Sequence, residues 1–174
     1  MTTAVLSDLH VGAVNKQSVA TEPASLAAIA DRLEGVDHVV LLGDVLEHLV
    51  DPAAALRGMH ALLTPGGVVI ASIPNVACWP ARLALARGTF DYADFGIFDR
   101  THLRFFTRRT ARALAGEAGF RVEAELFAPV ERAPGLLRRT LPLATDVVYK
   151  RLMRVWPELL AQQFVLRLRP AGGS

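Results

Sequence analysis

The sequence contains a single cysteine, Cys78, in 174 residues. One cysteine cannot form an internal disulfide or a zinc site built from several thiolates, so a reducing, cytoplasmic setting is the default expectation. The sequence also lacks an apolar run of the roughly 20 residues that a membrane-spanning helix requires. Its first residues show no basic stretch followed by an apolar core, which argues against a secretion signal. We therefore expect a cytoplasmic protein without a transmembrane segment.

The chain also lacks a large excess of positive or negative charge. Lysine and arginine together number 19 against 17 aspartate and glutamate residues, which leaves a formal net charge of +2. The arginines are spread along amphipathic segments, a distribution more typical of a solvated face than of a phosphate-binding track. We therefore expect no nucleic-acid partner. The chain is 52% hydrophobic and long enough to bury a core, which predicts one domain over residues 1–174.

Short apolar runs alternate with segments of helical period, the pattern of βαβ units on a parallel sheet. We expect strands at residues 4–6, 39–42, 68–73, 121–127 and 163–168. Helices are expected at residues 21–34, 52–63, 108–118 and 146–155, with Asp51 and Thr107 as N-caps of the second and third. Residues 64–67 should turn the chain, and residues 74–106 show no clear period. The predicted fold class is α/β, an incomplete Rossmann-like, mostly parallel sheet flanked by helices.

The last three quarters of the chain hold five short motifs in a fixed order. They are 38–49 (HVVLLGDVLEHL), 62–67 (LLTPGG), 72–75 (SIPN), 88–92 (GTFDY) and 98–107 (FDRTHLRFFT). With these motifs, residues 37–170 resemble the second half of a class I S-adenosylmethionine-dependent methyltransferase. The last two motifs resemble one branch in particular, the methyltransferases associated with sugar and cell-surface polymer pathways.

The resemblance implies a cofactor, S-adenosylmethionine, and a small-molecule or glycan-precursor substrate. Ligands of an open parallel sheet bind beyond the carboxyl ends of its strands, where two of the motifs lie. By the resemblance, the cofactor-binding residues are Gly43, Asp44, Val45 and His48. The implied substrate contacts are Asn75, Tyr92 and Arg104. His102 is the candidate for a base or a substrate contact, and the alternative is that His102 only joins Asp99 and Arg100 in a network that holds a loop.

The first part of the chain departs from that family. The family binds the cofactor through a glycine-rich turn after its first strand and binds the ribose through an acidic residue after its second strand. Here Gly12 is the only glycine before Gly35, and Asp31 and Glu34 fall in an expected helix. We therefore expect the chain to be weak or inactive alone.

Residues 4–47 carry a second pair of motifs, 5–13 (VLSDLHVGA) and 39–47 (VVLLGDVLE). They resemble the start of a calcineurin-like metallophosphoesterase. This resemblance implies that Asp8 and His10 bind a divalent metal such as Mn²⁺ or Zn²⁺ and that Asp44 bridges two metals. The Asn-His pair of that family does not follow, because Asn75 precedes a valine. The alternative reading is therefore a metal-binding fragment rather than a phosphatase.

The two resemblances overlap at residues 43–47, which suggests a fusion of a metallophosphoesterase-like start, 1–36, with a methyltransferase-like part, 37–170. A sheet assembled in this way would have few strands and an exposed edge. A second copy of the chain or another partner could cover that edge. A third functional class is thus a non-catalytic protein that depends on a partner.

Overall fold

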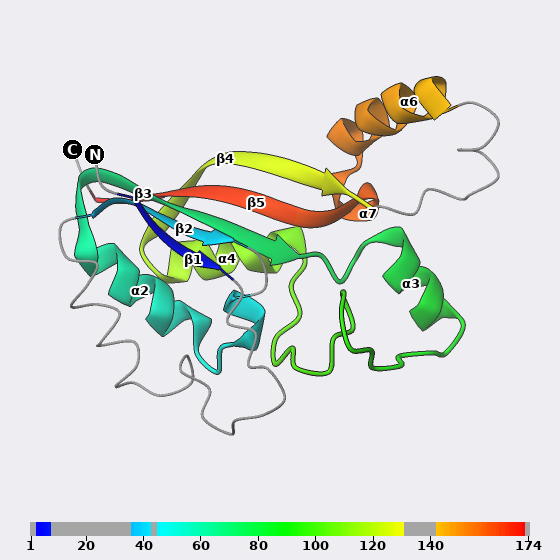
Figure 1. Ribbon diagram of the computed structural model, residues 1–174, viewed down its shortest axis with the longest axis horizontal. Coiled ribbons are helices and arrows are strands. Elements are labelled where there is room, and N and C mark those ends of the chain that lie inside the picture. The colour runs from blue at the N-terminus through cyan, green and yellow to red at the C-terminus, as the bar shows by residue number, and fades with distance from the viewer. Residues whose placement is uncertain (1–2, 8–35, 43–44, 131–141, 173–174) are drawn as a thin grey trace.

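The computed structural model describes residues 3–7, 36–42, 45–130 and 142–172, and Figure 1 shows its elements. The strands are β1 (Thr3–Ser7), β2 (Val36–Leu42), β3 (Leu63–Pro74), β4 (Phe120–Pro129) and β5 (Ala161–Pro170). The helices are the 3-10 helix η1 (Leu46–His48) and the α-helices α2 (Pro52–Leu62), α3 (Trp79–Ala86), α4 (Arg108–Glu117), α6 (Pro142–Val155) and α7 (Pro157–Leu160). None of the described helices is long and apolar enough to cross a membrane.

The five strands form one sheet in the order β1-β2-β3-β5-β4. Strands β1, β2 and β3 are parallel neighbours, whereas β5 pairs antiparallel with both β3 and β4. Four strands of the described sheet therefore run in one direction and β5 runs against them. The α/β fold class, with an incomplete Rossmann-like and mostly parallel sheet, is confirmed.

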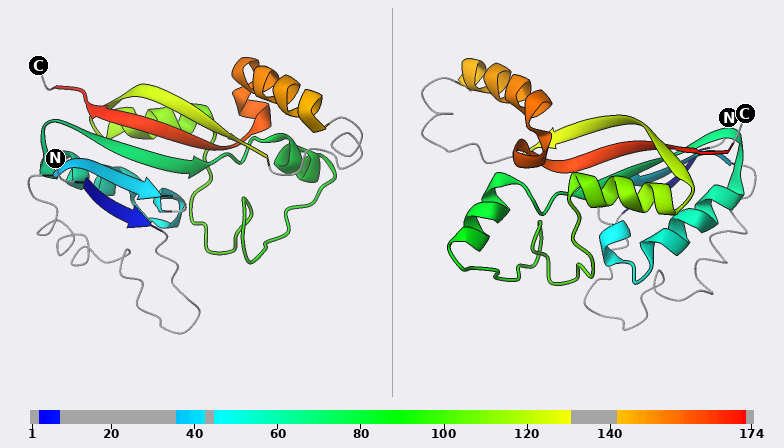
Figure 2. Two further views of the ribbon diagram at one scale, coloured as in Figure 1. Left: turned by 45° about the horizontal axis from the view of Figure 1, so that its top comes forward. Right: turned by 180° about the vertical axis from the view of Figure 1, so that it is seen from behind.

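The core lies between the sheet and the helices α2 and α4, which cover the same face, as the view from behind shows (Figure 2). Leu56 of α2 and Leu114 of α4 join Ile73 of β3 and Phe164 of β5 in one buried cluster. Leu56 and Phe164 are at most 1% exposed, and burial of a side chain of this size contributes about 1.5–3 kcal/mol. This packing fixes both helices against the central strands.

Two helices begin at the caps that the sequence predicts. The Oδ1 atom of Asp51 accepts a hydrogen bond from the Ala54 N–H at 2.8 Å and starts α2. Thr107 starts α4 through a reciprocal capping box, in which its own N–H donates to the Thr110 Oγ1 at 2.9 Å and its Oγ1 accepts from the Thr110 N–H at 3.3 Å. The helix expected at 21–34 lies outside the described residues.

Strand β3 begins at Leu63 rather than at the expected Val68, so the irregular residues 64–67, with Gly66 at a φ of 85°, lie within the strand and not before it. The strand pairing runs from Val36–Leu63 to His38–Val68. Between these pairs β2 has one residue and β3 has four, so residues 64–67 form a bulge within the β2–β3 pairing. Leu63 therefore does not belong to the helix that the sequence predicted.

Gly67 permits this bulge because its backbone lies directly against β2. A Cβ atom at Gly67 would lie 2.9 Å from the Asp37 carbonyl oxygen and 3.0 Å from that of Thr64. The Thr64 hydroxyl also donates to the Asp37 Oδ1 at 2.9 Å. Backbone contact and side-chain hydrogen bond together hold the start of β3 in the sheet.

Helix α3 is an element that the sequence pattern did not predict. Ala81 is its one buried residue, so the helix has no apolar stripe of the kind from which a helical period is read. The local feature that does indicate a helix here is the proline in its first turn, after Cys78.

Replacing Gly67 by alanine should destabilise the protein by about 2 kcal/mol, because the new methyl group would overlap the backbone of β2. The matched control is Gly58→Ala in α2, where nothing lies within 4 Å of the added Cβ. That control should gain roughly 0.5–1 kcal/mol from helix propensity. Urea denaturation followed by circular dichroism measures both changes. Equal effects of the two substitutions would contradict the close approach at Gly67.

Candidate functional site

One loop joins the carboxyl ends of β2 and β3, the edge where ligands of such sheets bind. The Glu47 carbonyl of η1 accepts two hydrogen bonds from this loop, from the Leu103 N–H at 2.8 Å and the Arg104 N–H at 2.9 Å. Just beyond β3, the Val76 N–H donates to the Phe106 carbonyl at 2.9 Å. These bonds place the segment between residues 98 and 106 across both strand ends.

The loop brings two histidines together. The rings of His48 and His102 pack edge to face, with their centroids 4.9 Å apart. The Nδ1 atom of His48 lies 3.1 Å from the Thr101 carbonyl oxygen, and that of His102 lies 3.2 Å from the Ile97 carbonyl oxygen. A carbonyl oxygen only accepts hydrogen bonds, so Nδ1 carries the proton in each ring. In the neutral form of each ring, Nε2 is then the basic nitrogen.

A buried carboxylate lies beside the histidine pair. Asp99 is 6% exposed and accepts hydrogen bonds from the Thr101 N–H at 2.8 Å and the Thr101 hydroxyl at 2.6 Å. Burial raises the pKa of Asp99, but the two Thr101 hydrogen bonds and the positive charge that His102 and His48 can carry outweigh it, so the pKa lies below its usual value. Asp99 is therefore ionised at neutral pH and stabilises positive charge on the histidines.

Aromatic rings continue from the histidine pair to the surface. His102 contacts Phe105 at 6.2 Å between centroids, and Phe105 contacts Phe90 at 5.6 Å. Phe90 in turn contacts Phe98 at 4.6 Å and Tyr92 at 5.5 Å. Tyr92 is 60% exposed. Phe90, Phe98 and Phe105 thus form an aromatic wall that extends from His102 toward the surface.

The structure assembles some of the predicted site residues. His48 and His102 are in contact, and Tyr92 joins them through the aromatic wall. Arg104 lies in the loop of residues 98–106, which we call the histidine loop, but its guanidinium donates to the Val50 carbonyl at 2.6 Å. The loop-holding role considered for Asp99 is also present, because its carboxylate binds the Thr101 backbone.

Two other predicted residues have structural roles. Val45 packs in the main core and is 3% exposed. Asn75 is fully buried, its side-chain N–H groups donate to the Glu158 and Ala161 carbonyls, and its Oδ1 accepts from the Ala77 N–H. This geometry turns every polar atom of the Asn75 amide toward backbone rather than toward a ligand, and its substrate role stays a prediction. Gly43 and Asp44 lie outside the described residues.

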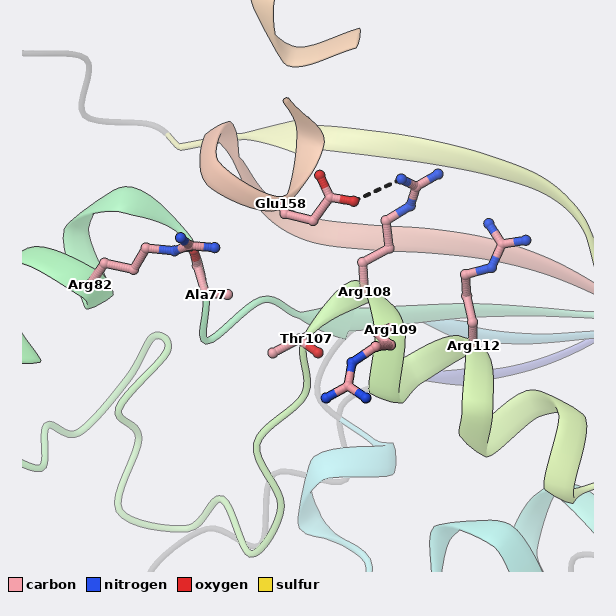
Figure 3. Close-up of a pocket in the computed structure, with 7 residues that line it drawn as sticks. All are labelled: Ala77, Arg82, Thr107, Arg108, Arg109, Arg112 and Glu158. Atoms are coloured by element: carbon pink, nitrogen blue, oxygen red, sulfur yellow. Dashed lines mark hydrogen bonds and ion pairs between the residues drawn. The ribbon is translucent and has the colours of Figure 1, made fainter. Parts of the chain in front are cut away.

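A second feature, which the sequence pattern did not reveal, is a cavity of about 340 Å³ beyond the end of β3 (Figure 3). Its lining residues are Ala77, Arg82, Thr107, Arg108, Arg109, Arg112 and Glu158. The sequence feature that could have indicated this cavity is the absence of any acidic residue from the first turn of α4. Negative charge is usually favoured at that position.

Arg108 is held rigidly at the wall of this cavity. Its guanidinium donates to the Glu125 carboxylate at 2.6 Å and to the Glu158 carboxylate at 2.8 Å, and it lies 5.4 Å from the ring centre of Phe127. The hydrogen bonds to Glu125 and Glu158 raise the pKa of Arg108 above its ordinary value. Arg112 also donates to Glu125, at 3.1 Å. The first turns of α4 are thereby tied to β4 and α7.

No group of three or more potential metal ligands occurs among the residues that the structure describes. The predicted metal ligands Asp8, His10 and Asp44 lie outside those residues.

The comparisons with known proteins point in one direction. A family model described as a methyltransferase domain matches residues 5–125. The ubiquinone biosynthesis O-methyltransferase of Ruegeria pomeroyi is 40% identical over 78 residues, which are 39% of this chain and 31% of that protein. The protein of the same name from Ralstonia nicotianae is 36% identical over 101 residues, 52% of this chain and 40% of that protein. The chain thus spans less than half the length of these relatives.

Solved structures of similar shape carry related names. A methyltransferase from Thermotoga maritima, described as S-adenosylmethionine-dependent and as a possible histamine N-methyltransferase, has 18% identity and a TM-score of 0.48, over 78% of this chain and 56% of that one. An S-adenosylmethionine-dependent methyltransferase from Archaeoglobus fulgidus has 14% identity and a TM-score of 0.49, over 82% and 64% of the two chains.

The metallophosphoesterase interpretation is not supported. One family match covers residues 5–125, which include Asp8, His10 and Asp44 as well as the overlap at 43–47. The same match removes the reason for a fusion of two families, because a single family accounts for both sides of the overlap.

Replacing Asp99 by asparagine should destabilise the protein, and the loss should be larger at pH 5–7 than at pH 3. The folded-state pKa of Asp99 is lowered, whereas an unfolded aspartate titrates near 3.9. The charge therefore adds stability above about pH 5, and this contribution is lost as the pH falls through the folded-state pKa. Urea unfolding across this range measures the difference, with the exposed Asp91→Asn as control. A loss of stability independent of pH would refute the assignment.

Proposed function

The chain belongs to the methyltransferase-domain family, and we propose that it takes part in methyl transfer from S-adenosylmethionine to a hydroxyl oxygen, with weak turnover when it acts alone. The family match over residues 5–125 supports the reaction class. The observation that carries the proposal is the contact of His48 and His102 beside the buried Asp99, at the carboxyl edge of the parallel strands.

The histidine pair fits the proton transfer that such a reaction requires. A hydroxyl group must lose its proton as its oxygen bonds to the methyl group. The Nε2 atom of His102 is the basic nitrogen of the neutral ring, because Nδ1 donates to the Ile97 carbonyl. The charge of Asp99 favours the imidazolium that forms. General base catalysis of this kind contributes about 10²–10⁴-fold to the rate.

The cofactor would supply a methyl group already activated by its positive sulfur. The described side chains after β2 do not fit the rest of the cofactor. Val45 and Leu46 belong to the main core, and the Glu47 side chain is 1% exposed. Binding of the ribose and adenine would need Gly43, Asp44, residues 8–35 or a partner. This is our reason for proposing weak turnover by the chain alone.

The proposed acceptor is a sugar or cell-surface polymer precursor, because residues 88–92 and 98–107 resemble that branch of methyltransferases. The names of the relatives from Ruegeria and Ralstonia, O-methyltransferases of ubiquinone biosynthesis, support oxygen as the acceptor atom. They also raise a second candidate, a phenolic acceptor. The aromatic wall formed by Phe90, Phe98 and Phe105 favours this candidate.

A thermal melt of the chain with and without S-adenosylmethionine tests cofactor binding. A ligand that binds only the folded state stabilises it by about 2.7 kcal/mol at a hundredfold excess over its Kd. We expect the melting temperature to rise with cofactor concentration and to remain unchanged with adenosine triphosphate at the same concentration. If S-adenosylmethionine causes no rise, methyl transfer by this chain alone is refuted and the non-catalytic alternative gains support.

Replacing His102 by asparagine should lower methyl transfer by about 10²-fold or more. The asparagine amide can still donate to the Ile97 carbonyl, so the loop is retained while the basic Nε2 is lost. Transfer of labelled methyl groups to nucleotide-activated sugars and, separately, to catechols measures the rate. The control is His60→Asn, because His60 lies on α2 and its ring packs against Phe120 of β4, away from the histidine pair. Cofactor affinity should be unchanged in both variants, and unchanged turnover in His102→Asn would exclude the base role.

A further inference from the structure

We propose that the arginine-lined cavity beside α4 binds the phosphate or diphosphate group of a small-molecule ligand. We call it the arginine cavity and define it by its lining residues Ala77, Arg82, Thr107, Arg108, Arg109, Arg112 and Glu158. Its volume of about 340 Å³ lies at the lower end of the range for small-molecule sites. Neither the family match nor the histidine pair accounts for it.

Positive charge exceeds negative charge in the arginine cavity. Four guanidinium groups line it, against the single carboxylate of Glu158. Glu125 adds a second carboxylate from β4, which both Arg108 and Arg112 contact. Even with Glu125 included, two positive charges remain in excess. An anion of two negative charges would balance them, and guanidinium groups match phosphate oxygens in geometry.

The donors needed for such an anion are available on Arg82 and Arg109. Both side chains are exposed. Arg82 uses its Nε–H to reach the Ala77 carbonyl at 2.5 Å, and its terminal nitrogens form no hydrogen bond with a described residue. Arg109 forms neither a hydrogen bond nor an ion pair within the described part of the chain. Figure 3 shows that Arg82 comes from α3, across the cavity from the arginines of α4.

The remaining arginines are preorganised at a cost to the helix. Arg108 is fixed between Glu125 and Glu158, so it loses little freedom when an anion binds. Arg108, Arg109 and Arg112 all lie in the first half of α4, where the positive end of the helix dipole disfavours cations. The Thr107 capping box already pairs the N–H groups of Thr107 and Thr110 at the helix start. The guanidinium groups, rather than the helix end, are therefore the proposed anion ligands.

The position of the cavity suits the acceptor of the proposed methyl transfer. Thr107 lines the cavity, and His102 lies five residues earlier on the same loop. Five residues span at most about 18 Å when fully extended, so His102 and the cavity lie within reach of one ligand only if that ligand spans their separation. As an acceptor subsite this inference rests on the proposed function; anion binding itself does not.

Calorimetric titration of the full chain with inorganic pyrophosphate, without cofactor and at an ionic strength of about 0.15 M, tests the site. The site variant is Arg82→Gln/Arg109→Gln. The control is Arg57→Gln/Arg151→Gln, which removes the same charge from exposed positions on α2 and α6. We expect saturable binding that weakens about tenfold or more in the site variant and stays within about twofold in the control, where only long-range charge is lost. Melting curves establish that both variants fold.

The inference is overturned if pyrophosphate shows no saturable binding, or if both double variants weaken it equally, since the effect would then be one of net charge. Two further probes identify the source of the phosphate. Displacement of pyrophosphate by uridine diphosphate glucose indicates a soluble ligand. If the chain sediments with phosphatidylcholine vesicles that contain phosphatidic acid, and the site variant does not, the phosphate belongs to a lipid-linked ligand. If the chain binds pyrophosphate but not S-adenosylmethionine, the proposed anion site is supported and the proposed methyl transfer by the chain alone is refuted.

Discussion

The site depends on two hydrogen bonds to one carbonyl group, that of Glu47. The Leu103 and Arg104 N–H groups both donate to it, and together with the His48–Thr101 and Arg104–Val50 hydrogen bonds they hold the histidine loop near the end of β2. Phe106 of the same loop is buried in the main core, whereas Leu103 and Arg104 themselves are exposed. Because backbone groups buried away from water must be paired, the doubly accepting carbonyl fixes the register of the loop. That register sets His102 against His48.

The same loop connects two environments of opposite character. The Phe90–Phe105 contact and its neighbours form an aromatic wall at one end, and the arginine cavity lies at the other. A ligand that spans both would need an apolar or sugar-like face and an anionic group. The Val76–Phe106 hydrogen bond anchors the loop between these environments. Their separation is therefore fixed by the sheet, which is the requirement for holding a reacting hydroxyl at a set position.

Sequence patterns predicted the parts of the fold that local physics determines. The helices α2 and α4 were predicted because Asp51 and Thr107 cap them and because they bury one face. Helix α3 was missed because little of it is buried. The bulge before Val68 was missed because it depends on the close approach of Gly67 to the backbone of β2, a tertiary contact that the local sequence does not show. The contact of His48 with His102 spans 54 positions and depends on tertiary hydrogen bonds. The arginines were read as a solvated face, since the sequence does not show that α3 and α4 meet at one cavity.

Asp99 and the arginines of α4 are described features that work against folding stability, and both lie in the proposed sites. Asp99 is an ionised carboxylate with 6% exposure, and burial of a charge costs free energy that its Thr101 hydrogen bonds must offset. The arginines of α4 oppose the helix dipole, and an acidic residue there would stabilise the helix by about 0.3–1 kcal/mol. Among the described residues, the caps of α2 and α4 and the packing of the main core agree with one another. Local choices that contradict an otherwise consistent fold are expected where function constrains the residues. The histidine loop and the start of α4 are therefore the regions where we place ligand binding.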